Sequence, residues 1–178
     1  MQIRMLAIAA AMAAFPAAAA AQGMGQGHQA VGINSIKPLY EQFKGWIIAS
    51  AEQMPEADYG YQPTPEVRTF GQMIGHVAGA GYAFCAGAMG EERPSMPNAE
   101  EMTSKAELVE AVKASFAYCD KAYAMPESKA MEQTTFFGRE GSRLWVLNFN
   151  VTHVAEHYGN LVTYMRLKGM VPPSSQRG

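Results

Sequence analysis

Apolar residues recur at intervals of three and four along four segments of this chain, with polar residues between them. In the first segment this spacing extends from Ile36 to Met54 and predicts an amphipathic helix over 35–54. Pro55 ends the helix, and residues 55–68, which contain three prolines, are expected to form a loop.

The second segment predicts a helix over 69–89 with its start and end marked in the sequence. Thr69 followed by Gln72 has the pattern of a capping box, and Gly90 stands where a C-terminal cap would lie. The helix is rich in glycine, and each glycine weakens an isolated helix by roughly 0.8–1 kcal/mol relative to alanine. Packing must therefore stabilise it, and its small residues allow close approach of neighbouring backbone.

Two further helices are expected over 104–124 and 142–169, the first with a capping box at its start and the second with a nearly heptad apolar stripe. The polar stretches 91–103 and 126–141 are interpreted as connections, the latter with at most a short helical turn. No strand is indicated. Four helices joined by polar connections predict an all-α fold, a four-helix bundle over 35–173.

The N-terminal residues have the pattern of a targeting segment. Residues 1–21 combine Arg4, an apolar run and a terminal series of alanines, which is typical of a secretory signal peptide cleaved after Ala21. Residues 22–34 are Gly-rich and are expected to be a flexible leader. The mature protein is thus predicted to be periplasmic or secreted, and no later segment is apolar enough to span a membrane.

Composition narrows the function classes. With 48% hydrophobic and 17% charged residues the chain can bury a core, which excludes disorder as its main state. The net charge of −2 and the lack of a basic stripe argue against a nucleic-acid partner. Two cysteines are too few for a disulfide scaffold or a Cys-rich zinc module.

Three histidines on predicted helices are the strongest candidates for chemistry. His153 and His157 are four residues apart and share one helix face, while His76 lies in the second helix among glycines and alanines that leave space around it. Three neutral imidazoles suit Zn, Ni, Fe or Cu and leave coordination positions open for water or substrate. The alternative is that they are hydrogen-bonded core residues. His28, in the leader, is expected to be solvated.

Three stretches of sequence resemble the DinB-like (DinB/YfiT-like) superfamily: RTFGQMIGHVA at 68–78, HVAEHYGNL at 153–161 and YMRLKG at 164–169. The resemblance implies a four-helix bundle with a long crossing connection between the second and third helices. It also implies a divalent metal, most often Zn or Ni, held by histidines at the positions of His76, His153 and His157. Many relatives have Arg-Gly-Gln after the last histidine, where this chain has Tyr-Gly-Asn, so no substrate pocket is carried over.

Polar residues near the three histidines are candidates for supporting roles. Asn150, Asn160 and Glu156 could orient the imidazole N–H groups, although for Glu156 a solvated carboxylate is the favoured interpretation. Tyr164 is expected either to hydrogen-bond near the site or to pack. Three charged residues could assist catalysis: Arg68, Arg139 and Glu140. For the two arginines, the alternative is a solvent-exposed position on the surface.

The two cysteines are candidates for a disulfide. If the second and third helices run parallel, as the resemblance implies, Cys85 and Cys119 lie at similar heights, and an oxidising compartment would favour a bridge. Two separate buried thiols are the alternative.

The resemblance suggests functions without fixing one. Its characterised members include metal-dependent transferases and isomerases that use low-molecular-weight thiols, so a thiol transferase is one expectation. Export from the cytoplasm conflicts with a cytosolic thiol cofactor. A metal-dependent hydrolase and a non-catalytic protein that binds a metal or small ligand are therefore kept as alternatives. The small-molecule ligand is left open, and some members of the superfamily form homodimers.

Overall fold

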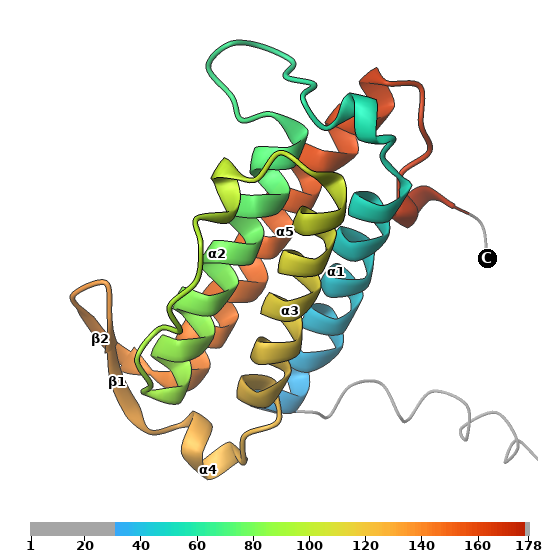
Figure 1. The fold of residues 1–178 in the computed structure, drawn as a ribbon. Coiled ribbons are helices and arrows are strands. Elements are labelled where there is room, and N and C mark those ends of the chain that lie inside the picture. Colours follow the sequence, from blue (N-terminus) through green and yellow to red (C-terminus); the bar gives the residue numbers. More distant parts are fainter. Residues whose placement is uncertain (1–30, 177–178) are drawn as a thin grey trace, which may run out of the picture.

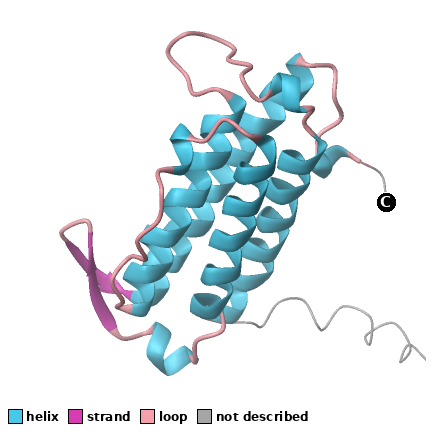
Figure 2. Ribbon diagram, viewed as in Figure 1, coloured by secondary structure: helices cyan, strands magenta, loops and turns pink. Residues whose placement is uncertain are grey.

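The computed structural model describes residues 31–176, so the predicted signal peptide and most of the predicted leader lie outside the described residues. Four long helices make up most of the described chain, and a short helix, a two-stranded sheet and three 3₁₀ turns accompany them (Figures 1 and 2). The helices are α1 (Ile33–Gln53), α2 (Phe70–Met89), α3 (Lys105–Tyr123), α4 (Glu127–Ala130) and α5 (Arg143–Leu167), and the strands are β1 (Gln133–Phe136) and β2 (Arg139–Ser142).

The long helices pack side by side around a shared core. Helix α2 contacts α3 and α5, and α1 contacts the same two helices from the other side. Helices α2 and α3 run in the same direction, while α1 and α5 run in the opposite one (Figure 1). Because α2 and α3 are parallel, the chain between them must return along the length of α2, and its last part contains a 3₁₀ turn, Ala99–Glu101.

Local capping explains where the helices begin. The Thr69 hydroxyl accepts a hydrogen bond from the backbone N–H of Gln72, and the Gln72 side chain accepts one from the backbone N–H of Thr69, which completes the predicted capping box. Ser142 caps α5 in a similar way by accepting from the backbone N–H of Trp145. Helix α1 begins at Ile33, so residues 33–34 of the predicted leader are helical.

Helices α2 and α3 are joined covalently and approach each other closely. A disulfide connects Cys85 of α2 to Cys119 of α3. The Ser115 hydroxyl of α3 donates a hydrogen bond to the carbonyl oxygen of Ala78, and a Cβ atom on Gly81 would lie only 2.5 Å from the Ser115 hydroxyl oxygen. The glycines that weaken an isolated α2 therefore permit this tight contact between the parallel helices.

The expectation of an all-α chain is wrong in the segment 126–141. After α4, strands β1 and β2 form an antiparallel hairpin whose turn residues, Phe137 and Gly138, both have positive φ. Two positive φ angles are typical of a type I′ turn, whose twist matches that of the paired strands.

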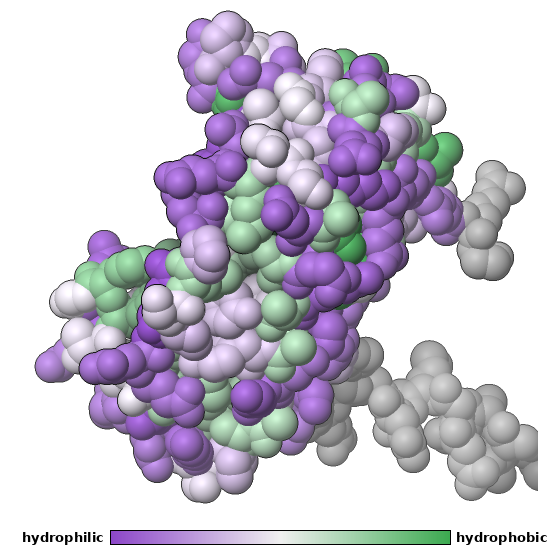
Figure 3. Space-filling view, in the orientation of Figure 1, coloured by the Kyte–Doolittle hydropathy of each residue, from purple (hydrophilic) through white to green (hydrophobic). Residues whose placement is uncertain are grey.

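The hairpin is held against the helices by aromatic packing. Phe136 of β1 is 8% exposed, and its ring centroid lies 5.0 Å from that of Phe84 in α2. Phe137, by contrast, is 74% exposed. Hydrophobic residues lie among polar ones on the surface at the hairpin end of the molecule (Figure 3). Among the described residues, no helix combines the length and the hydropathy needed to cross a membrane.

Candidate metal centre

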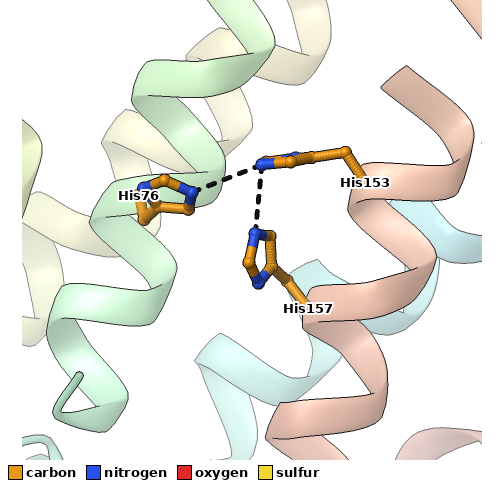
Figure 4. Close-up of side chains that lie close together, drawn as sticks. All are labelled: His76, His153 and His157. Atoms are coloured by element: carbon orange, nitrogen blue, oxygen red, sulfur yellow. Dashed lines mark hydrogen bonds between the residues drawn. The ribbon is translucent and has the colours of Figure 1, made fainter. Parts of the chain in front are cut away.

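The structure brings the three predicted histidines together between α2 and α5 (Figure 4). The Nε2 atom of His153 lies 3.3 Å from that of His76 and 3.0 Å from that of His157. The candidate ligand atoms of all three residues lie within 4.8 Å of one another. Residues 77 positions apart in sequence, His76 and His153, thus point their imidazoles at one small volume.

The separation of these nitrogen atoms fits a tetrahedral metal site. A zinc ion binds imidazole nitrogen at about 2.0–2.1 Å, which places two tetrahedral nitrogen ligands roughly 3.3 Å from each other. The distances from His153 to the other two histidines are close to that value. The three ligand atoms are separated by up to 4.8 Å, so the rings of His76 and His157 would move toward each other to hold a divalent ion, with a fourth position left for another ligand.

Burial keeps the pair of histidines on α5 in the form that binds metal. Burial lowers the pKa of His153 to about 4, with smaller contributions from His157 and His76. Burial also lowers the pKa of His157 below its ordinary value. Both rings are consequently neutral near pH 7, and a neutral imidazole has the nitrogen lone pair that a metal requires.

Glu100 orients the third histidine. One oxygen of its carboxylate lies 2.7 Å from Nδ1 of His76, and the other accepts a hydrogen bond from Nε of Arg68 at 2.9 Å. Burial alone would raise the pKa of Glu100, but the hydrogen bonds from Arg68 and His76 outweigh it and hold the pKa below its ordinary value. The carboxylate accepts a hydrogen bond from the Nδ1–H group, so the Nε2 lone pair of His76 faces the other histidines.

The imidazole nitrogens that point away from the centre differ in their partners. The side-chain amide of Asn160 lies 3.4 Å from Nδ1 of His157, which agrees with the orienting role predicted for it. Nδ1 of His153 is buried and has no hydrogen-bond partner among the described residues. The same role predicted for Asn150 is wrong, because this residue is buried in the core and donates to the Tyr123 hydroxyl oxygen.

A cleft of about 580 Å³ opens beside His157, one of the three histidines. His157 and Asn160 form part of its wall, together with the Arg68–Glu100 pair. Tyr164 also lines the cleft and donates a hydrogen bond to the carbonyl oxygen of Arg68. The structure thus shows the first of the two roles expected for Tyr164, a hydrogen bond near the site.

Of the other charged candidates, Glu156 lies at this cleft and the hairpin residues do not. Glu156 is exposed and belongs to the cleft wall. Arg139 and Glu140 lie in β2 and do not line the cleft. The cleft therefore combines an imidazole of the candidate metal centre with several polar side chains.

The fold and the site together define a mostly helical protein with a three-histidine cluster suited to a divalent ion. Residues 47–161, more than half of the chain, match the family model of the DinB superfamily. The chain therefore belongs to the DinB superfamily, which confirms the resemblance. No curated protein matches the sequence.

Solved structures share this fold at low sequence identity. A DinB-like protein from Bacillus cereus is 16% identical with a TM-score of 0.68, and the match covers 80% of this chain and 96% of that protein. A mycothiol-dependent maleylpyruvate isomerase is 20% identical with a TM-score of 0.60, covering 74% of this chain and 61% of the isomerase. A histidine-to-alanine mutant of that isomerase matches equally well, with a TM-score of 0.60 at 19% identity.

Proposed function

We propose that this chain is an exported enzyme of a metal-dependent type, in which His76, His153 and His157 hold a divalent ion, most readily Zn or Ni. The observation that carries the proposal is the convergence of three Nε2 atoms beside an open cleft. A metal store without catalysis would be expected to enclose its ion with side chains. Here His157 instead borders a space of about 580 Å³, large enough for a small molecule.

The residues around the centre have distinct roles in this proposal. A divalent ion bound by three imidazoles supplies Lewis acidity, which lowers the pKa of a thiol or of water. Glu100 fixes the tautomer of His76, and Asn160 positions the ring of His157. Exposed Glu156, at the cleft wall, is suitably placed to accept a proton from a ligand.

A low-molecular-weight thiol is the first candidate for the activated nucleophile. The fold similarity to a mycothiol-dependent isomerase supports it, and the reaction would then be a metal-dependent thiol transfer. Water is the second candidate, making the protein a hydrolase. The predicted signal peptide and the Cys85–Cys119 disulfide support water, because both indicate an oxidising periplasmic or secreted environment that is poor in free thiols.

Metal analysis tests the proposed site. We expect purified wild-type protein to contain about one divalent ion per chain, and His153→Ala and His157→Ala to lose it. His28→Ala, which makes the same change in the leader, is the matched control and should keep the ion. An unchanged metal content in both α5 variants would overturn the site.

Spectroscopy of the cobalt-loaded protein separates the two nucleophiles. A thiol that binds the ion produces a thiolate-to-cobalt charge-transfer band in the near ultraviolet. Addition of cysteamine should generate this band if the cleft admits a thiol ligand, and ethanolamine should not. If cysteamine does not generate the band, the result contradicts thiol binding at the ion and favours water as the nucleophile.

A further inference from the structure

We propose that the cleft beside the histidines binds a small-molecule carboxylate, and that the terminal nitrogens of Arg68 are the anchor for it. The inference deepens the proposed function by naming a ligand class for the same site, and it rests on that function for the role of the metal. It is carried by the way in which Arg68 is held in the cleft.

Two contacts fix Arg68 at opposite ends of the residue. Its Nε donates to Glu100 at 2.9 Å, and its backbone carbonyl accepts from the Tyr164 hydroxyl at 2.8 Å. The side chain is nevertheless 40% exposed and lines the cleft. Among residues 31–176, no acceptor forms a hydrogen bond with its two terminal nitrogens.

The free end of this guanidinium has a defined chemical preference. With Nε occupied by Glu100, the two terminal nitrogens present a planar pair of N–H donors. Such a pair matches the two oxygens of a carboxylate and binds them in a bidentate manner. Because Glu100 and Tyr164 already restrain the residue, a ligand has less side-chain entropy to remove on binding.

The charges of the surrounding residues make binding of an anion depend on the metal. Glu66, Glu100 and Glu156 line the same cleft as Arg68. Their carboxylates repel any anion, and the divalent ion proposed at the histidines would offset this repulsion for a ligand that reaches it. A carboxylate on the Arg68 donors is thus favoured when the rest of the ligand extends to the metal.

The position of the histidines indicates what the rest of the ligand carries. His157 and Asn160 line the same space of about 580 Å³ as Arg68, so a molecule anchored on Arg68 can extend to the candidate metal centre. The ligand class is therefore a small carboxylate with a second metal-binding group at its other end. Succinate, with a carboxylate at each end, is a simple probe of this class.

Calorimetry with zinc-loaded full-length protein tests the inference. We expect succinate to bind wild-type protein, and the uncharged isostere succinamide to bind at least about tenfold more weakly. Arg68→Gln should lose at least about tenfold in succinate affinity, and Arg68→Lys should fall between the two. Arg139→Gln removes the same charge from the hairpin, outside the cleft, and should bind succinate as the wild type does.

Two results would overturn the inference. One is equal binding of succinate and succinamide by the wild-type protein, a comparison that does not depend on the folding of any variant. The other is unchanged succinate affinity in Arg68→Gln, which would mean that the zinc ion alone binds the acid. Zinc content measured on the same samples separates the two proposals: loss of zinc from the wild type contradicts the metal site, whereas full zinc without carboxylate selectivity contradicts only the role of Arg68.

Discussion

A Cβ atom on Gly75 would lie 2.3 Å from the carbonyl oxygen of Ala99, so the backbone of α2 and the 3₁₀ turn at 99–101 are as close as a glycine allows. Each of these two residues directly precedes a member of the candidate site, His76 and Glu100. The missing side chain at Gly75 thus lets the Glu100 carboxylate reach Nδ1 of His76.

Gly75→Ala is expected to displace the 3₁₀ turn and destabilise the protein. The cost of overpacking, typically about 1–3 kcal/mol, should exceed the gain of about 1 kcal/mol from the better helix propensity of alanine. Gly79→Ala is the matched control in the same helix, since its Cβ would meet only the end of Arg93 at an ordinary 3.6 Å. Urea unfolding should show a loss for Gly75→Ala and a gain for Gly79→Ala, and a gain for both would refute the close contact.

Glu100→Gln is expected to weaken metal binding about 10–100-fold, because the uncharged amide supports the His76 tautomer less well. Competition with a zinc-binding dye measures the affinity. Glu101→Gln changes the neighbouring residue, whose carboxylate accepts a hydrogen bond from the Asn98 side chain and has no other hydrogen-bond partner within residues 31–176, and should leave the affinity unaltered. Equal affinities for the two variants would show that Glu100 does not support the metal centre.

Breaking the disulfide should destabilise the fold substantially. A bridge between residues 34 positions apart restricts the unfolded chain, which corresponds to about 3–4 kcal/mol of stability in the chain-entropy model. We expect the Cys85→Ala/Cys119→Ala double variant to unfold at lower urea concentration than oxidised wild type. Reductant should lower the stability of the wild type and leave that of the double variant unchanged. Complete alkylation of both cysteines without reductant would exclude the bridge.

The metal-free protein is expected to lose stability in mild acid. The folded-state pKa of His153, about 4, lies below its ordinary value of 6.5, so between these values the unfolded chain binds more protons than the folded one. The free energy of unfolding therefore rises with pH across this window and falls as the solution is acidified. His157, whose pKa is lowered too, acts in the same direction.

Chemical unfolding of the apo protein at several pH values between 4 and 6.5 measures this dependence. His153→Asn removes the titrating group and should flatten the slope. A slope as steep in this variant as in the wild type would show that His153 is not the source of the acid sensitivity.

The long helices were predictable because local chemistry marks their ends. The Thr69 capping box, the glycine at position 90 and the proline at position 55 act within a few residues of each boundary, and the structure places the helix ends close to them. The meeting of the three histidines was suggested by helical spacing for one pair. Placing His76 beside this pair required the resemblance to a family, since residue spacing within one helix does not show which other helices pack against it.

The features that sequence reasoning missed depend on tertiary contacts. The hairpin turn has Phe137 rather than the usual Asn or Asp before its glycine, so the common turn signal is absent. Glu100 lies in an irregular connection 24 residues from His76, where no periodicity applies. Asn150 lies beside the apolar stripe on a helical wheel, but only the position of Tyr123 shows that it is a core residue.

The parallel course of α2 and α3 has a consequence for how the site could have arisen. An antiparallel pair needs only a short link at one end, and such a link would stay far from the first turns of α2. The longer connection returns to the beginning of α2, where its residue Glu100 orients the ring of His76. The long connection thus supplies a functional group to the site. Substitutions confined to this connection would change the surroundings of the histidines without changing the helices.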